Sequence, residues 1–422
     1  MTRTPDATVD SATPVRQGTA RDVLAIASFR RIFLASVASS TGRWMQNVAL
    51  GIFAYNLDGS KSFTTLVVGV QMFPLLALSL PSGSLADTVD RRKLLIVTQA
   101  WQAVFGVILA WQVWDGEIAP WVLLSIVFAI GVGQALYAPT FTAVIPTLVG
   151  RENLASAIAL NSMMINGSRI LGPILGSATL GIIKISGIFL VNSATYLIII
   201  FVLAITPIPT VVRDHRLSVS DRLFGGLRVA FRSPQVGGSL LVMVTFSLLC
   251  LPFIGLLPAI AEESWGVDSE SATYGMIYAV FGAGALAGVT AVASGLGRFD
   301  RALVVRCTLA LFALALGAMS FVTTAALAFP AMFFVGLFYF TMPTVLSTFL
   351  QEHLSDEVRG RVMALWIVSF GGIISITNLF AGRIADATSL HAVLLFGAGV
   401  AMALAVLARL RPGPIAGEEL LR

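Results

Sequence analysis

Twelve apolar runs of roughly 20 residues repeat along this 422-residue chain, from residue 32 to residue 410. A helix of that length crosses a hydrocarbon core about 30 Å thick. Hydrophobic residues make up 57% of the chain and charged residues 12%, which is too little polar surface to cover a soluble globule of this size. The lipid bilayer is therefore the expected surroundings of most of the chain.

The runs are long and uniformly apolar, without the short alternation of a membrane barrel, so each must satisfy its backbone groups internally. The sequence thus predicts an all-α membrane protein with twelve transmembrane helices. The predicted spans are residues 32–56, 63–85, 94–114, 121–147, 155–182, 187–208, 239–261, 272–294, 302–322, 326–350, 362–384 and 389–410.

Basic residues indicate the orientation. Of the 27 lysines and arginines, 22 fall in the tails and loops on the side of the termini, and three (Lys61, Lys184 and Arg383) fall on the other side. Arg43 and Arg169 complete the count inside spans. Because positive loops stay cytoplasmic, we expect a multi-pass protein of the plasma membrane with both termini in the cytoplasm.

Several classes of function are not indicated by the sequence. The net charge of +5 follows the membrane orientation and forms no basic, aromatic groove, so nucleic acid is not an expected partner. Cys250 and Cys307 stand apart from any CxxC or His cluster, so neither a disulfide, a metal nor a cofactor is expected. No Ser-His-Asp grouping or phosphate-binding loop points to an enzyme or to an ATP-driven pump.

The chain divides into five predicted parts. These are a disordered cytoplasmic tail (1–28), a six-helix bundle (29–208), a linker with an amphipathic helix (209–238), a second six-helix bundle (239–411) and a cytoplasmic tail (412–422). The bundles are expected to be pseudo-symmetric repeats, because a shift of 210 residues places Asp90-Arg91 over Asp300-Arg301. Gly297 stands where the second copy of Asp87 would be.

The loop between the second and third spans carries Gly-Ser-Leu-Ala-Asp at 83–87 and Arg-Arg at 91–92. This string resembles the loop signature of the major facilitator superfamily. Residues 145–154, 168–173 and 356–363 narrow the resemblance to the branch that includes enterobactin exporters and macrolide-type drug efflux proteins. Together the similar strings run from about residue 29 to residue 386.

The resemblance implies that Gly83, Asp87, Arg91 and Arg92 stabilise the outward-open state as a conformational latch. A plain positive-inside anchor is the alternative. Thr88 and Asp90 depart from the Arg and Gly that the superfamily often has there. The predicted latch also includes these charged loop residues: Asp90, Asp300, Arg301, Asp356, Arg359 and Arg361.

Polar residues within the first span form a stripe. Ser39, Arg43, Gln46 and Asn47 share one helix face, and Trp44 lies beside them. An ionisable group at membrane depth is costly unless it faces a cavity or a partner, so we expect this stripe to line a central substrate cavity. The alternative is that Arg43 snorkels to lipid headgroups. Relatives often have an acid at this place.

Arg169 in the fifth span follows Asn166 by three residues and precedes Gly172-Pro173 and Gly176. The Gly-Pro string resembles the antiporter motif of drug exporters, where small residues let helices pack closely and bend. Two roles are open for Arg169: it faces the cavity, or it donates to carbonyls freed by the proline.

Further cavity candidates are polar or aromatic residues inside other spans, although buried amides more often tie helices together than bind ligand. These candidates are Gln134, Asn161, Asn166, Trp366, Phe370 and Asn378.

Proton coupling has few visible carriers, because no Asp or Glu falls in the middle of a span and all three histidines lie in loops or at span ends. The candidates are Asp87, Glu352 with His353, or a proton carried by the substrate. The expected function is proton-coupled export of an amphipathic, drug-like or siderophore-like and possibly anionic small molecule by a monomer. The alternatives are an importer, a lipid or lysolipid flippase, and a transport-inactive receptor.

Overall fold

The structure is a computed structural model, and it describes residues 19–114, 116, 118–150, 152–180, 182–209, 219–294, 299–408, 410 and 416–417. Side chains at 79–88, 155, 162, 166, 177, 180, 219–224, 293, 356 and 357 fall outside the description. So do most residues of the two predicted tails. The described part is helical, and its one extended pairing is an isolated bridge between Leu354 and Ala416.

The helices follow one another with short connections. In chain order they are α1 (Ala20–Ala25), α2 (Ala27–Asp58), α3 (Lys61–Thr88), α4 (Arg91–Gln112), α5 (Pro120–Val149), α6 (Leu154–Leu180), α7 (Ile185–Ile205), α8 (Val219–Arg232), α9 (Pro234–Leu249), α10 (Phe253–Trp265), α11 (Ala272–Ser294), α12 (Arg301–Met319), α13 (Ala325–Glu352), α14 (Asp356–Ile367), the π-helix η2 (Val368–Gly372), α15 (Ile373–Ala387) and α16 (Leu390–Leu407).

Each predicted span lies on one helix or on one broken helix. Ten segments of the described chain are long and apolar enough to cross a membrane. The helices α2 and α6, which carry Arg43 and Arg169, are not among the ten. An all-helical membrane fold is thus confirmed, whereas the count of twelve spans stays a prediction.

Two of the predicted spans are interrupted. The span 239–261 divides into α9 and α10 at Pro252, whose ring cannot continue the backbone ladder. The hydroxyl of Thr377 in α15 lies 2.8 Å from the carbonyl oxygen of Leu248 and 3.2 Å from that of Ser247, so it meets groups next to the break. The span 362–384 contains the π-helix η2.

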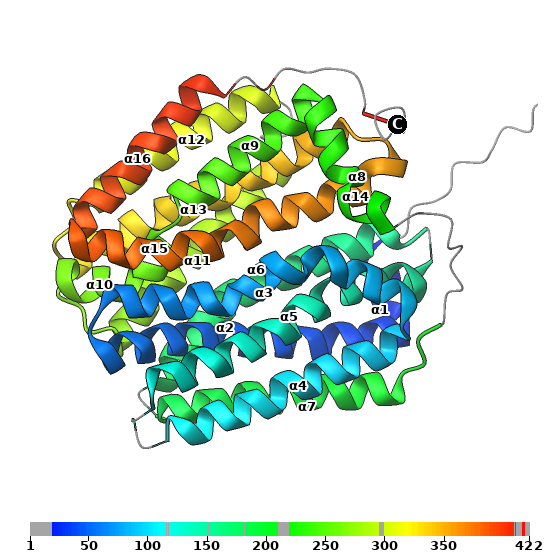
Figure 1. The fold of residues 1–422 in the computed structure, drawn as a ribbon, viewed down its shortest axis with the longest axis horizontal. Coiled ribbons are helices and arrows are strands. Elements are labelled where there is room, and N and C mark those ends of the chain that lie inside the picture. The colour runs from blue at the N-terminus through cyan, green and yellow to red at the C-terminus, as the bar shows by residue number, and fades with distance from the viewer. Residues whose placement is uncertain are drawn as a thin grey trace, which may run out of the picture.

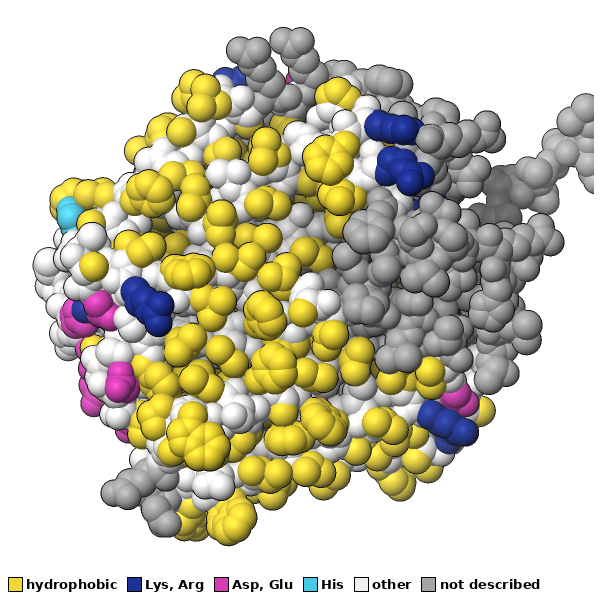
Figure 2. All heavy atoms as spheres, viewed as in Figure 1, with side chains coloured by type: hydrophobic (Ala, Val, Ile, Leu, Met, Phe, Trp, Pro, Cys, Tyr) yellow, Lys and Arg dark blue, Asp and Glu magenta, His cyan; other side chains and the backbone are white. Residues whose placement is uncertain are grey.

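Two groups of helices lie side by side in Figure 1, with α1–α7 in one and α8–α16 in the other. They meet chiefly where α3 packs on α15 and α6 packs on α11. Within the second group α11 and α13 approach closely, since a Cβ added at Gly284 would lie 2.0 Å from the Phe333 carbonyl oxygen. Figure 2 shows hydrophobic side chains over a broad part of the surface, across both groups of helices.

The helix α8 lies within the linker predicted at 209–238 and packs on α14. On α8, Val229 is fully buried, whereas the side chain of Phe231 is 82% exposed. In Figure 1 both α8 and α1 lie at the same end of the bundle, on the right of the view. We call this the terminal end, and the other the opposite end.

Candidate functional site

Arg169 lies between aromatic rings from both groups of helices. Its guanidinium carbon is 5.4 Å from the ring centroid of Trp44 in α2 and 4.9 Å from that of Phe340 in α13. The side chain is half-buried, and its Nε atom is buried without a hydrogen-bond partner. Cation–π attraction therefore holds Arg169 in place while a strong donor is left unused.

Small residues on α6 explain how Arg169 reaches Trp44. A Cβ added at Gly172 would lie 2.3 Å from the Trp44 Cβ, and one added at Gly176 would lie 3.3 Å from the Met45 Cα. The backbones of α2 and α6 thus approach more closely than any larger residue allows. Pro173 is buried inside α6 between these glycines, so the predicted bending motif is also a packing motif.

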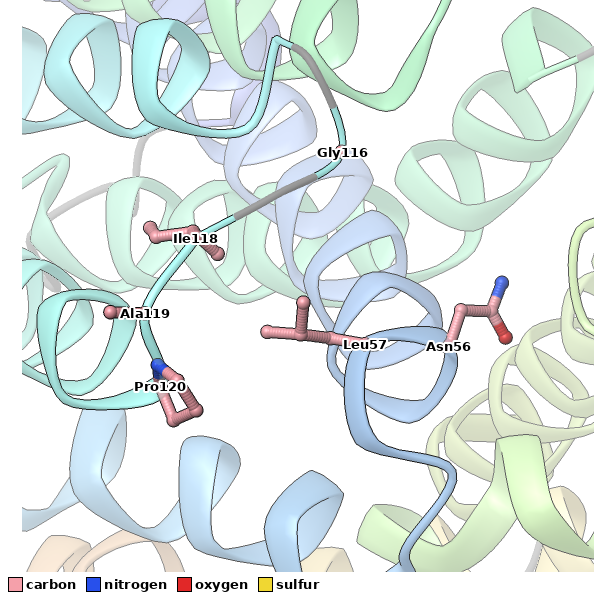
Figure 3. Close-up of a pocket in the computed structure, with 6 residues that line it drawn as sticks. All are labelled: Asn56, Leu57, Gly116, Ile118, Ala119 and Pro120. Carbon is pink, nitrogen blue, oxygen red and sulfur yellow. The ribbon is translucent and has the colours of Figure 1, made fainter.

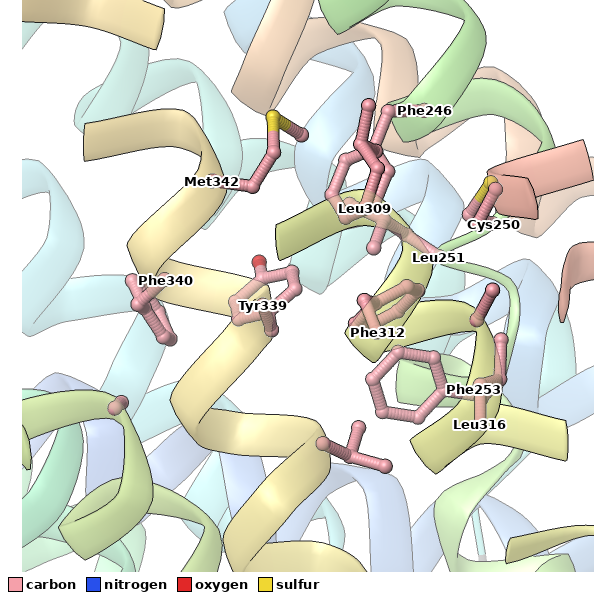
Figure 4. Packing of buried hydrophobic residues seen from close by; sticks show 14 of the residues in the cluster. Phe246, Cys250, Leu251, Phe253, Leu309, Phe312, Leu316, Tyr339, Phe340 and Met342 are labelled. Atoms are coloured by element: carbon pink, nitrogen blue, oxygen red, sulfur yellow. The ribbon is translucent and has the colours of Figure 1, made fainter. Parts of the chain in front are cut away.

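An aromatic cluster continues from Phe340 into the second group of helices. Tyr339 has its ring centroid 4.3 Å from that of Phe340, 5.6 Å from that of Phe281 and 6.1 Å from that of Phe370. Figure 4 shows Tyr339 on the side of α13 that faces Phe246. Phe370 was predicted for this wall, whereas Phe340 was missed, because nothing distinguishes it from the other aromatic residues of 333–340.

Arg43 has a different environment. Its Nη1 atom donates to Gln134 Oε1 at 2.6 Å, and Nη2 donates to Ser40 Oγ at 3.0 Å. Both partners belong to the first group, so the structure brings Arg43 and Gln134 together as neighbours. No ion pair joins Arg169 to a carboxylate of the described chain.

The rest of the predicted stripe bonds to neighbouring helices. Gln46 is fully buried and accepts from Asn192 Nδ2 at 2.7 Å. Asn47 accepts from Gln71 Nε2 at 3.2 Å, and Ser39 is buried. These contacts tie α2 to α7 and α3, as buried amides commonly do.

The other cavity candidates are dispersed. Asn161 lines a small apolar pocket with Phe29 and Phe141, and its Oδ1 has no partner. Asn378 is fully buried, donates to the Ile374 carbonyl at 2.9 Å and leaves its own Oδ1 unpaired. Trp366 is buried in the core of the second group. The side chain of Asn166 lies outside the described residues.

Several predicted latch residues bind at helix ends. Asp90 caps α4 by accepting from the Lys93 amide at 3.1 Å, and Asp300 caps α12 by accepting from the Ala302 amide at 2.8 Å. These caps occupy corresponding places in the two groups. Position 83 is a glycine without a side chain, and the side chains of Asp87 and Asp356 lie outside the described residues.

The latch arginines contact main-chain carbonyls and one carboxylate. Arg91 donates to Ala143 O at 2.7 Å, and Arg92 donates to Leu203 O at 2.7 Å. Arg359 donates to Leu354 O at 3.1 Å, and a buried Nη1 of Arg361 has no partner. Arg301 binds Glu352, one of the predicted candidates for a proton carrier, through two bonds of 2.8 and 2.6 Å.

A surface depression of about 630 Å³ opens at the opposite end of the bundle. Figure 3 shows Leu57 and Ile118 among its lining residues, with Asn56 at its edge. No charged side chain of the described chain lines it. Since Asn56 is thirteen residues beyond Arg43 on α2, this depression is separate from the arginines and is not the candidate site.

Comparison with known proteins identifies the class. The family model described as transmembrane secretion effector matches residues 19–416, so the chain belongs to this family of the major facilitator superfamily, whose members are multi-pass membrane transporters.

Individual relatives are more distant. The enterobactin exporter EntS of Shigella boydii serotype 4 (strain Sb227) is 25% identical over 349 residues, covering 80% of each chain. EntS of Escherichia coli O9:H4 (strain HS) is 25% identical over 352 residues with the same coverage.

Solved structures share the fold at low identity. The nucleoside transporter NupG superposes with a TM-score of 0.72 at 11% identity, covering 89% of this chain and 97% of that one. A D-xylose-proton symporter gives a TM-score of 0.69 at 13% identity, covering 90% and 98%. The resemblance to the superfamily is thus confirmed.

Proposed function

We propose that this protein is a secondary active transporter that exports an amphipathic, negatively charged small molecule across the plasma membrane, with both termini in the cytoplasm. The observation that carries the proposal is Arg169, a cation held by Trp44 and Phe340 from opposite groups of helices with no ion pair to a carboxylate of the described chain.

The negative charge proposed for the substrate follows from a difference in hydrogen bonding between Arg43 and Arg169. Gln134 and Ser40 satisfy donors of Arg43, whereas the Nε of Arg169 is unpaired. A cation at membrane depth is costly without a partner, and an anionic ligand provides that partner. The planar guanidinium suits paired oxygens, such as those of a carboxylate or a catecholate.

The amphipathic character proposed for the substrate follows from the aromatic side chains that surround Arg169. Trp44, Phe340 and Tyr339 offer ring surfaces next to the charge, and ligand sites commonly combine such apolar walls with a few polar groups. A molecule with an aromatic body and an anionic edge fits this combination best.

The proposed mechanism is rocking of residues 29–208 against residues 239–411, with 209–238 as the linker and the charged inner loops as latches. Arg169 suits a site at the axis of such a motion because it contacts both groups. Proton coupling is part of the proposal, with Asp87 and the Glu352–His353 pair as carriers.

Export is the proposed direction because the curated relatives are enterobactin exporters. Import is the second candidate, since a D-xylose-proton symporter shares the fold. The sign of transport under an imposed gradient separates the two.

The test is uptake of a catecholate siderophore into inside-out membrane vesicles under an imposed pH gradient. Loss of Arg169 in the Arg169→Ala variant is expected to raise the KM about tenfold or more, and Arg169→Lys to recover part of this loss. Vesicle protein levels are matched by immunoblot. An unchanged KM in Arg169→Ala would remove Arg169 from the substrate site.

A further inference from the structure

A lysine joins the two groups of helices at the opposite end of the bundle. Lys61 begins α3, and its Nζ atom lies 2.9 Å from Glu263 Oε1 in α10 and 3.8 Å from Asp386 Oδ1 in α15. The lysine side chain is only 17% exposed, and the carboxylates are 40% and 37% exposed. One cation from the first group is therefore shared by two acids from the second.

Neighbouring polar contacts strengthen the same junction. The Ser62 amide and hydroxyl both donate to Asp386, the amide at 3.2 Å. The Tyr55 hydroxyl donates to Glu263 at 3.3 Å. One turn deeper, the Gly382 amide donates to Thr65 Oγ1 at 3.1 Å. Each of these bonds runs between the first group and the second.

At the terminal end, two of the described arginine bonds each run within one group. Arg91 of α4 reaches Ala143 of α5, and Arg301 of α12 reaches Glu352 of α13. The two groups of helices are therefore joined to each other by polar contacts at the opposite end. This arrangement is that of a conformation closed at the opposite end.

We propose that Lys61, Glu263 and Asp386 form the outer gate of the transporter, defined as the ion-pair cluster that must separate before the two bundles can open to the outside. The assignment rests on the alternating access proposed above. Partly exposed ion pairs are individually weak, and this suits a contact that breaks in every transport cycle.

Lys61 has the largest expected effect of the three. Without its charge, Glu263 and Asp386 repel each other across the junction, so the closed state loses an attraction and gains a repulsion. Neutralising both Glu263 and Asp386 removes the attraction to Lys61 without adding a repulsion, so its expected effect is smaller.

Opening can be measured at Ile52, a fully buried residue of α2 that packs in the hydrophobic core of the second group. With Cys250 and Cys307 replaced by alanine, the Ile52→Cys thiol reports opening by its reaction with a membrane-impermeant maleimide on intact cells. Lys61→Met is expected to accelerate this labelling about tenfold, and Glu263→Gln with Asp386→Asn about threefold.

Two matched variants control for charge and place. Lys184 lies at the same end, but its Nζ is 5.9 Å from the Trp114 ring of its own group, so Lys184→Met is expected to label at the parental rate. Lys61→Arg retains the charge and is also expected to label at the parental rate.

Parental labelling in both the Lys61→Met variant and the double amide variant would overturn the gate. Equal acceleration by Lys184→Met would overturn it as well, because the effect would then belong to any cation at that end. Labelling requires no substrate, so absence of export would refute the proposed cargo without changing this result.

Discussion

Two arginines of one chain meet the same apolar surroundings in different ways. Arg43 donates hydrogen bonds to an amide and a hydroxyl, those of Gln134 and Ser40. Arg169 has aromatic faces, whose attraction of about 0.5–2 kcal/mol does not replace a hydrogen bond to Nε. At the scale of single residues, Arg43 is a structural cation and Arg169 is the one suited to a ligand.

This division predicts that Gln134→Leu acts on stability. Without the amide, Arg43 Nη1 is left unpaired, which costs about 1–3 kcal/mol. The melting temperature in detergent is expected to fall by several degrees, while the KM for the anionic substrate stays at its parental value. Ser125→Ala, whose hydroxyl bonds only to the Trp121 carbonyl of its own helix, is the control. A raised KM at an unchanged melting temperature would instead place Gln134 in the substrate site.

At the scale of elements, the contact between α2 and α6 depends on residues without side chains. Gly172 and Gly176 lie on the face of α6 that meets Trp44 and Met45. This face brings the ring of Trp44 to Arg169, which is three residues before Gly172. The geometry of the candidate site is thus a consequence of helix packing.

Gly172→Ala is expected to destabilise the protein by about 1–3 kcal/mol, because the new methyl group would overlap the Trp44 Cβ and force α2 away from α6. Gly167 on the same helix has nothing within 4 Å of an added Cβ. Gly167→Ala should therefore be neutral or slightly stabilising. Thermal unfolding of the two variants in one detergent compares them, and equal melting temperatures would contradict the packing role.

At the scale of the whole molecule, the positions of the helices could be predicted from the sequence, but the pairs of helices that pack on one another could not. The length of the apolar runs alone locates the helices, because an apolar segment that crosses the bilayer must form a helix of about 20 residues. The break before α10 was missed although Pro252 marks it in the sequence. What the sequence does not show is the partner of the carbonyls next to the break, Thr377, which comes from a distant helix. Likewise, the spacing of the polar residues between 39 and 47 predicts that they share one helix face, but it does not predict which helix packs against that face. Lys61 was used only for orientation, because Glu263 and Asp386 are about 200 and 325 residues away in the sequence.

Orientation itself remains open to a direct test at two exposed lysines. Lys93 lies at the start of α4, near the terminal end, and Lys184 precedes α7 at the opposite end. The excess of basic residues on the terminal side predicts that this side is cytoplasmic. In a background lacking Cys250 and Cys307, an impermeant maleimide should label Lys184→Cys in intact cells and Lys93→Cys only in inside-out vesicles.

The two preparations control each other, because each thiol must react in one of them. The opposite pattern would place the termini outside and would move the gate of Lys61, Glu263 and Asp386 to the cytoplasmic face. Residues Arg301 and Glu352 would then face the exterior, where a proton enters first. The labelling pattern therefore decides on which side of the membrane the proposed gate closes, independently of any assay of substrate.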